Sequence, residues 1–279
     1  MARGKKALPK LSELIEKFSQ EDVIAVMEKE YQSSPTRLIP SSLIDDTSFV
    51  SFVKVSEQTI EAFASGLQEK GFYNPLVVRE KAGGRYELVL GRKRFLGAKR
   101  AGILSLPCVV LNVGDEEVLL MLLADTRDQR DTNVVELATI CKALMDLFHY
   151  TQKTLADLTH QSRSQITNIL RILSLPSEVL DLISLGELSY GHAKALCSLP
   201  PSQIGPLLRK IHDEGLSVRD AEALARDSKS LTESKEEKAL LSRYNLCSDV
   251  SIQAKSVTFR FASTEDKRKF ILKMLKKQK

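Results

Sequence analysis

The chain has 279 residues, 43% of them hydrophobic and 28% charged, which is typical of a folded globular protein and excludes a disordered chain. No run of eighteen apolar residues is present, so the sequence predicts no membrane-spanning helix. Forty-one Lys and Arg residues against thirty-six Asp and Glu residues leave a net charge of +5. The basic residues are concentrated in residues 1–10, 91–100 and 264–279, which favours contact with phosphates at particular places on the surface.

The length allows two or three small domains. The first ten residues are basic but lack the apolar h-region of a secretory signal, so we expect a cytoplasmic protein. The cysteines fit that location, because they are widely scattered, form no CxxC pair and stand among apolar residues, as reduced core thiols do. They are Cys108, Cys141, Cys197 and Cys247.

Residues 1–36 are expected to form a flexible N-terminal arm. Within this arm, apolar residues recur at helical spacing from Leu11 to Tyr31, which predicts an amphipathic helix. Two roles are open for such a helix: it packs loosely on the next domain, or it binds a partner.

Residues 37–125 are expected to form a mixed α/β domain. The helix signals are clear at Ser56, which can cap a helix, and at Gly71, which can end it. The pair Gly83-Gly84 between two apolar runs predicts a hairpin turn. The expected strands are 38–40, 75–79, 86–90 and 106–110, and the expected helices are 57–70, 92–101 and 116–124.

Gly91 joins a predicted strand to a helix that opens with Arg92, Lys93 and Arg94. Free amides at a helix N-terminus, the helix dipole and three cations together suit a phosphate group. A solvated charged face is the alternative, because a lone glycine before a basic helix is a weak motif. A second basic segment at residues 127–130 favours the phosphate site.

Two short helices are predicted between Thr151 and Pro176. Thr151 and Ser162 are each placed to cap a helix, and His160 lies in the turn, where helix-turn-helix motifs usually carry glycine. Histidine tolerates the left-handed backbone that such a turn needs. The second helix has apolar residues at helical spacing, which are Ile166, Ile169, Leu170 and Leu173.

The opposite face of this second helix is polar and has no carboxylate between Gln161 and Leu173. Its Ser, Arg, Gln, Thr and Asn side chains are donors of the kind that contact phosphates and base edges. An ordinary helical hairpin whose polar face meets water is the alternative. The composition of this face favours DNA, so we expect residues 126–227 to form an all-α, helix-turn-helix DNA-binding domain.

Residues 228–240 are polar and charged, and we expect a linker there. Residues 241–279 alternate at strand period and then continue as a basic amphipathic helix over about 263–277. Two strands and one helix bury too little surface to be stable alone, so this small β-β-α C-terminal domain is expected to self-associate. The predicted fold class is therefore α+β.

The order of these segments resembles the ParB family of centromere-binding partition proteins. Residues 86–102, YELVLGRKRFLGAKRAG, are similar to the family's arginine box, and residues 126–130 stand where the family has ENxQR. The runs NILRILSLP at 168–176, GELSYGHAKAL at 186–196 and LSVRDAE at 216–222 follow in the family's order. Together the matches cover about residues 38–224.

The resemblance implies two sets of site residues. The nucleotide-binding set is Asn74, Gly91, Arg92, Lys93, Arg94, Gln129 and Arg130. The DNA-binding set combines the polar face of the second predicted helix with three later positions that the family places near DNA. It is Gln161, Ser162, Arg163, Ser164, Gln165, Thr167, Asn168, Arg171, His192, Lys194 and Arg219. For His192, a buried core histidine is the alternative.

The departures from the family pattern bear on its cofactors, which are CTP and magnesium. Arg92 replaces the box glutamate and Leu96 its last arginine, while Thr126 and Arg127 replace the glutamate and asparagine of ENxQR. Losing two carboxylates removes the hard oxygen ligands that Mg²⁺ takes. We therefore expect CTP binding to persist and Mg²⁺ to be doubtful. With no catalytic residue identified, the protein is at most a weak CTPase.

The resemblance implies a homodimeric, nucleoid-associated protein that binds an inverted repeat (parS) and acts in chromosome or plasmid partition as a nucleotide-gated clamp. Its implied partners are a ParA-type ATPase and SMC condensin. A transcriptional repressor or a nucleoid-occlusion factor is the alternative, because both bind inverted repeats on the same scaffold. An enzyme of the wider superfamily, which includes sulfiredoxin, is disfavoured: residues 91–94 contain no cysteine, and Cys108 lies in an apolar strand that would raise its pKa.

Overall fold

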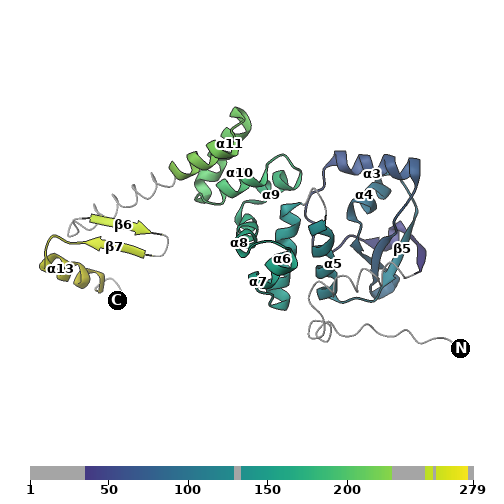
Figure 1. Ribbon diagram of the computed structural model, residues 1–279, viewed down its shortest axis with the longest axis horizontal. Coiled ribbons are helices and arrows are strands. Elements are labelled where there is room, and N and C mark those ends of the chain that lie inside the picture. The colour runs from purple at the N-terminus through teal and green to yellow at the C-terminus, as the bar shows by residue number, and fades with distance from the viewer. Residues whose placement is uncertain (1–34, 129–132, 228–248, 254–255, 276–279) are drawn as a thin grey trace. The chain divides into compact units, whose positions relative to one another are not determined.

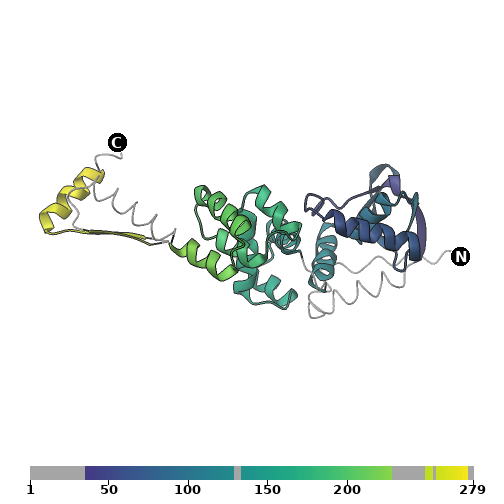
Figure 2. The same cartoon turned by 90° about the horizontal axis from the view of Figure 1, so that it is seen from above.

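The computed structural model describes residues 35–128, 133–227, 249–253 and 256–275. The chain divides into two compact units, Met1–Lys194 and Ala195–Lys279. Figure 1 labels the elements of each unit along the chain, and Figure 2 shows them from above. The helix expected between Leu11 and Tyr31 and the linker expected at 228–240 lie outside the described residues.

A five-stranded mixed sheet forms the first part of the Met1–Lys194 unit, in the order β1-β5-β3-β4-β2. The pairs β3–β5 and β2–β4 are parallel, whereas β1–β5 and β3–β4 are antiparallel. All four expected strands and the turn at Gly83-Gly84 are confirmed, and the short β2 was not predicted. The strands are β1 (Thr36–Pro40), β2 (Ile44–Asp45), β3 (Leu76–Glu80), β4 (Tyr86–Leu90) and β5 (Ser105–Leu111).

Helices α3 (Glu57–Lys70) and α4 (Arg92–Arg100) pack against each other and share a core with the sheet. As expected, the hydroxyl of Ser56 accepts a hydrogen bond from the first turn of α3 at 3.2 Å, and Gly71 ends the helix. Gly97 allows the close approach of α4 to α3, because a Cβ there would lie 2.6 Å from the Cβ of Phe63. The largest fully buried side chains of this core are Leu76, Leu88, Phe95 and Leu106.

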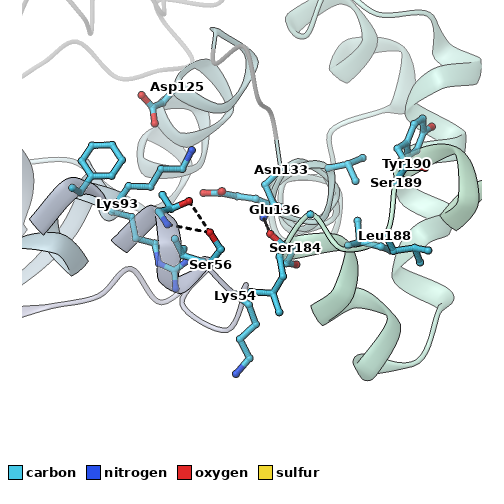
Figure 3. A pocket seen from close by; sticks show the side chains of 18 of the residues that line it. Lys54, Ser56, Lys93, Asp125, Asn133, Glu136, Ser184, Leu188, Ser189 and Tyr190 are labelled. Atoms are coloured by element: carbon cyan, nitrogen blue, oxygen red, sulfur yellow. Dashed lines mark hydrogen bonds between the residues drawn. The ribbon is translucent and has the colours of Figure 1, made fainter. Parts of the chain in front are cut away.

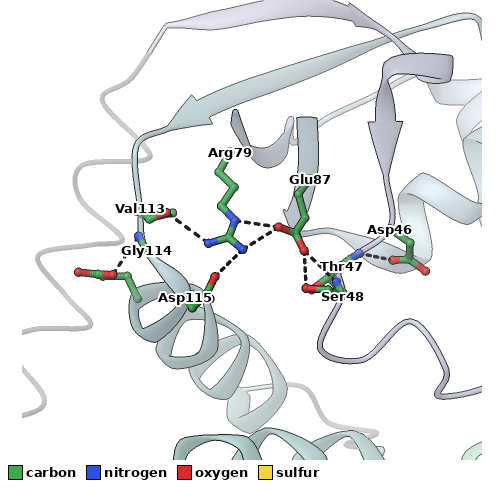
Figure 4. Close-up of polar contacts among 9 residues, drawn as sticks. Asp46, Thr47, Ser48, Arg79, Glu87, Val113, Gly114 and Asp115 are labelled. Atoms are coloured by element: carbon green, nitrogen blue, oxygen red, sulfur yellow. Dashed lines mark hydrogen bonds and ion pairs between the residues drawn. The ribbon is translucent and has the colours of Figure 1, made fainter. Parts of the chain in front are cut away.

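A buried polar network joins the sheet to the next helix, α5 (Asp115–Asp128) (Figure 4). The carboxylate of Glu87 on β4 is 2% exposed and accepts hydrogen bonds from the amide and hydroxyl of Ser48 at 2.9 and 2.6 Å. Arg79 on β3 donates to the same carboxylate from Nε and Nη2 at 2.9 and 2.7 Å, and pairs with Asp115 at 2.7 Å. Burial alone would raise the pKa of Glu87, but the hydrogen bonds from Ser48 and Arg79 outweigh it and hold that pKa below its ordinary value.

Helix α5 is longer than predicted, and α6 (Val134–Phe148) was not singled out from the sequence. We expected the first of these helices to end at Ala124, but residues 125–128 contain neither glycine nor proline, and the helix continues. The segment compared with ENxQR therefore begins inside α5. The side chain of Asn133 caps α6, accepting from the amides of Val135 and Glu136 at 3.1 and 3.4 Å.

Four further helices complete the Met1–Lys194 unit, the last of them crossing its boundary. They are α7 (Gln152–Leu158), α8 (Arg163–Arg171), α9 (Ser177–Ser184) and α10 (Tyr190–Leu196). Helix α10 ends at Leu196, in a turn that precedes Pro200. Among the described residues, no helix is long and apolar enough to cross a membrane.

The Ala195–Lys279 unit contains α11 (Pro201–Glu214), a helix over residues 218–227, an antiparallel hairpin of β6 (Asp249–Gln253) and β7 (Ser256–Arg260), and α13 (Thr264–Leu275). The expected β-β-α order of the C-terminal elements is present. Phe270 of α13 is buried, with its ring centroid 4.8 Å from that of Phe259 and 5.2 Å from that of Phe261. Ile271, the next residue of α13, is 45% exposed.

The substitution Glu87→Gln tests the buried network. It removes the buried carboxylate charge that pairs with the half-buried Arg79, and we expect the free energy of unfolding to fall by about 3 kcal/mol near neutral pH. Because the folded-state pKa of Glu87 is lowered, its contribution is present above the unfolded-state pKa and is lost as the pH falls through the folded-state pKa. Urea unfolding should therefore show the difference between wild type and variant shrinking below about pH 4.

The matched control is Asp45→Asn, which breaks the ion pair between Asp45 and Arg85. The side chain of Asp45 is 37% exposed and that of Arg85 is 44% exposed. Exposed pairs contribute less than about 1 kcal/mol. Equal losses in the two variants would contradict the special role given to the Glu87 network.

Candidate functional site

The turn between α7 and α8 is fixed by backbone hydrogen bonds. The amides of His160 and Gln161 donate to the carbonyls of Asp157 and Ala156 at 3.3 and 2.9 Å, which is the Schellman arrangement at a helix C-terminus. This arrangement needs a left-handed residue, and His160 has φ of 53°, as predicted. The two helices are therefore joined as a helix-turn-helix requires.

Three side chains of the predicted DNA-binding set are used to position α8. The amide of Gln165 donates to Oγ of Ser162 at 3.2 Å, and the amide of Ser162 donates to Oε1 of Gln165 at 2.7 Å, so the two residues form a capping box. The hydroxyl of Thr167 donates to Oε1 of Gln152 on α7 at 2.9 Å. These contacts fix the start of α8 and its angle to α7.

The apolar side of α8 differs in part from the prediction. Ile166 and Ile169 are buried as expected, but Leu170 and Leu173 are only half-buried. The chain leaves α-helical geometry after Arg171 and continues as a 3-10 turn, Ile172–Ser174, which places Ile172 in the core instead. The tighter turn changes which residue points inward.

The remaining predicted DNA-binding residues lie at the surface. Arg163, Ser164, Arg171 and Lys194 are exposed, and Gln161 and Asn168 are half-buried. His192 is not a core histidine: it is half-buried in the first turn of α10, with Nδ1 2.9 Å from Oγ of Ser189. Arg219 is exposed in the Ala195–Lys279 unit, whereas all the others belong to the Met1–Lys194 unit.

A cavity of about 870 Å³ opens at the N-terminus of α4 (Figure 3). Its size is that of a small-molecule site. One wall comes from α3, α4 and the segment before α3, and the other from α5, the start of α6 and the turn between α9 and α10. The polar and charged residues of its lining are Lys54, Ser56, Thr59, Arg92, Lys93, Arg94, Asp125, Asn133, Glu136, Ser184, Ser189 and Tyr190.

Gly91 shapes the α4 end of this cavity. Its φ of 97° is left-handed, and a Cβ would lie 2.8 Å from Cδ2 of Leu76, so only glycine fits without displacement. No side chain caps α4, and the amide of Phe95 is the first that donates to a helical carbonyl, that of Gly91 at 2.9 Å. The amides of residues 92–94 therefore have no acceptor within the helix.

The guanidinium groups of Arg92 and Arg94 hold neighbouring segments in place. Nε of Arg92 contacts Asp46 at 2.9 Å, while its Nη1 and Nη2 donate to the carbonyls of Val53 and Ser51 at 2.9 and 2.7 Å. Arg94 donates to the carbonyls of Asn74 and Pro75. Asn74 does not line the cavity, and Gln129 and Arg130 lie outside the described residues.

Sequence reasoning missed the carboxylates of the cavity. Figure 3 shows Lys93 extending from α4 toward the space between Asp125 of α5 and Glu136 of α6, while Lys54 points outward. Burial raises the pKa of Glu136, and the positive charges of Arg92 and Lys93 oppose that rise. The spacing Asn133-x-x-Glu136 signals only a helix start, so no local pattern reveals that α6 faces α4.

The carboxylates that line the described part of the cavity are Asp125 and Glu136. Among the described residues, no group of three or more His, Cys, Asp or Glu side chains gathers as metal ligands. Both carboxylate oxygens of Asp46 lie within 3.1 Å of Nε of Arg92. Leu96, which replaces the last arginine of the box, packs against the core of the sheet.

The cysteines of the described residues form no disulfide: Cys108 and Cys141 are buried and Cys197 is half-buried. Burial raises the pKa of Cys108 to about 12, in the direction that the sequence predicted. This thiol is not a nucleophile at neutral pH.

Two family models match the chain, the ParB N-terminal domain over residues 25–126 and the ParB HTH domain over residues 130–230. A probable chromosome-partitioning protein ParB of Pseudomonas putida is 30% identical over 207 residues, which are 74% of this chain and 70% of that protein. The chain belongs to the ParB family. The expected resemblance is thereby confirmed.

Other ParB relatives are longer than the matched part. The chromosome-partitioning protein ParB of Caulobacter vibrioides is 36% identical over 64% of this chain, and Spo0J of Thermus thermophilus is 38% identical over 61%. The chain spans 59% and 63% of the length of these two relatives.

Two crystal structures of C-terminally truncated ParB from Caulobacter crescentus are also similar. The complex with the centromeric parS site has a TM-score of 0.42 and 32% identity, covering 68% of this chain and 99% of that chain. The complex with CTP-gamma-S has a TM-score of 0.33 and 31% identity, covering 62% and 98%.

Substitution of His160 tests the turn of the helix-turn-helix. A β-branched residue adopts positive φ poorly, so His160→Val should lower the free energy of unfolding by about 1–2 kcal/mol. Glycine adopts it readily, so His160→Gly should change the free energy by less than about 1 kcal/mol. Thermal unfolding measures both, and equal stability of the two variants would contradict a left-handed turn at this position.

Proposed function

We propose that this ParB-family chain is a sequence-specific DNA-binding protein that marks an inverted repeat, a parS-like centromere, in chromosome or plasmid partition. The observation that carries the proposal is α8: a helix with a capping box at its N-terminus, a side on which Ile166 and Ile169 are buried, and a polar outer side, in a chain of this family. The ParB relatives support it, because they are named chromosome-partitioning proteins.

In this proposal the outer side of α8 enters the major groove. Arg163, Ser164, Asn168 and Arg171 offer the donors that read base edges and contact phosphates. His192 and Lys194 would add phosphate contacts from α10, and Arg219 would add one from the second unit. Ser162, Gln165 and Thr167 would act chiefly by holding α8 in position.

A homodimer would place two such helices on the two halves of the repeat. The β-β-α elements at the C-terminus support self-association, because two strands and one helix bury too little surface to be stable alone. Ile271, on α13, is 45% exposed and could contribute to a partner surface. We keep 37–125, 126–227 and 241–279 as the proposed domains, joined by a linker at 228–240.

We also propose that the cavity beside α4 binds CTP and gates the dimeric clamp. Its support is the N-terminus of α4, which opens at Gly91 and brings a helix dipole and three basic residues to the cavity, at the place where the sequence resembles the family's arginine box. The missing carboxylates at positions 92 and 126 favour slow hydrolysis.

Alanine substitutions on α8 test the DNA-reading face. Arg171→Ala and Asn168→Ala should each weaken binding to the cognate repeat by about 1–3 kcal/mol, which is roughly fivefold to more than a hundredfold. Fluorescence anisotropy with labelled duplex measures this. Lys142→Ala is the control, because this exposed lysine of α6 is paired with Asp146, outside the proposed face. Equal losses in all three variants would contradict the assignment of the face.

Turnover tests the nucleotide part of the proposal. We expect the full chain to bind CTP and to release phosphate at no more than a trace rate, with and without cognate DNA. A phosphate-release assay measures this, and rapid magnesium-dependent turnover would contradict the expectation of slow hydrolysis.

A transcriptional repressor or a nucleoid-occlusion factor is the second candidate, because the same helix-turn-helix would also bind the DNA sites of such proteins. Chromatin immunoprecipitation with sequencing separates the roles. A few sites near a replication origin with spreading would support partition, and nucleoid association with it, whereas promoter or dispersed sites would support the others. A ParA-type ATPase and an SMC condensin are the partners that partition would require.

A further inference from the structure

We infer that the edge of the five-stranded sheet at β1 is a docking surface for the chain's own segment 11–31. The sequence predicts an amphipathic helix in this segment and leaves two roles open for it, packing on the next domain or binding a partner. The sheet favours the first role, because the described elements leave part of one of its faces uncovered at β1. The inference does not depend on the proposed binding of DNA or nucleotide.

The helices of the α/β domain lie on both faces of the sheet. Ile39 of β1 and Val78 of β3 are buried in the core that the sheet shares with α3 and α4. Arg79 follows Val78 and points to the opposite face, where it pairs with Asp115 of α5 at 2.7 Å (Figure 4). By the same alternation, Leu38 lies on the α5 side of β1.

On the α5 side, the exposure of the side chains rises toward β1. Val109 and Pro107 of β5 are buried and half-buried, whereas Leu38, directly opposite Pro107 on β1, is 73% exposed. Pro40, on the same side of β1, is also exposed. Leu38, Pro40 and Pro107 therefore form an apolar edge strip that the described elements do not cover.

The width of the sheet explains why α5 leaves this edge strip open. Helix α5 packs on β4, and β1 lies three strands away from β4 in the sheet order, or about 14 Å at the usual strand spacing. A helix with its side chains is about 10 Å wide, and neighbouring helices pack about 8–10 Å apart. The α5 side of the sheet therefore has room for one further helix, over β5 and β1.

Segment 11–31 is an occupant that the chain itself supplies. Tyr31 is joined to Thr36, the first residue of β1, by four residues, which span at most about 17 Å. So short a tether gives the segment a local concentration on the order of millimolar at the edge strip. The apolar residues at helical spacing that lie nearest the tether are Val23, Val26 and Met27.

The small area of the edge strip disfavours a second copy of the chain as the occupant. The paired residues of β1 and β5, five on each strand, cover roughly 170 Å² at the usual strand dimensions. A stable complex between separate chains buries about 800 Å² on each partner. A tethered segment needs less area, because its association is intramolecular.

Site-specific photocross-linking from position 38 of the full chain tests the inference. Leu38 is replaced by the photoreactive p-benzoylphenylalanine, which its exposure allows. A mixture of ¹⁵N-labelled and unlabelled protein distinguishes, by mass, cross-links within one chain from those between chains. We expect cross-links to residues 11–31 of the same chain. Cross-links to a second copy, or none to residues 11–31, would overturn the inference.

Two adjacent substitutions separate docking from other effects of an added charge. Val26→Glu places a carboxylate on the apolar side of the predicted helix and should lower the yield of this cross-link about tenfold, because docking would bury the charge. Ala25→Glu adds the same charge on the opposite side and should leave the yield unchanged. Thermal unfolding checks that both variants fold. Equal yields in the two variants would show that the apolar side of the segment does not face the edge strip, which would also overturn the inference.

Discussion

The burial of α6 is the constraint on which both candidate sites depend. Val135, Leu137, Ile140 and Leu144 are buried along it, and it packs on α5, α8 and α9. Its N-terminus faces the cavity through Glu136, and Asn133 donates from Nδ2 to the carbonyl of Ser184 at 3.2 Å, which ties that wall to the end of α9. The helix that supports α8 is therefore also part of one wall of the cavity in which we propose that a nucleotide binds.

The charge at the start of α4 differs from the family's pattern, because position 92 carries a positive side chain in place of a negative one. Where the family has a carboxylate in its box, Arg92 pins the segment that contains Asp46, Ser51 and Val53. Arg92 and Asp46 form an ion pair at 2.9 Å. The carboxylates of the described lining, Asp125 and Glu136, lie on the α5 and α6 wall, and Figure 3 shows Lys93 extending toward the space between them. The described part of the cavity therefore carries charged groups of both signs.

Local signals predicted the parts of the fold that local chemistry determines. Ser56, Gly91 and the left-handed His160 marked helix boundaries correctly, and the strand periods gave four of five sheet strands. Glu136 and the turn between α9 and α10 were missed, because their meeting with α4 depends on tertiary packing. The polar face of α8 also contains side chains with different roles, which the sequence could not distinguish. Some of them point to solvent, whereas Thr167 donates a hydrogen bond to Gln152 of α7.

The central claim is that two copies of α8 read the two halves of an inverted repeat. Selection of duplexes from a random-sequence pool by the full chain, followed by sequencing and by measurement of the mass of the selected complex, tests it most directly. We expect one enriched site with two-fold symmetry, bound by two chains. A pool without an enriched sequence, or a single half-site bound by one chain, would contradict it.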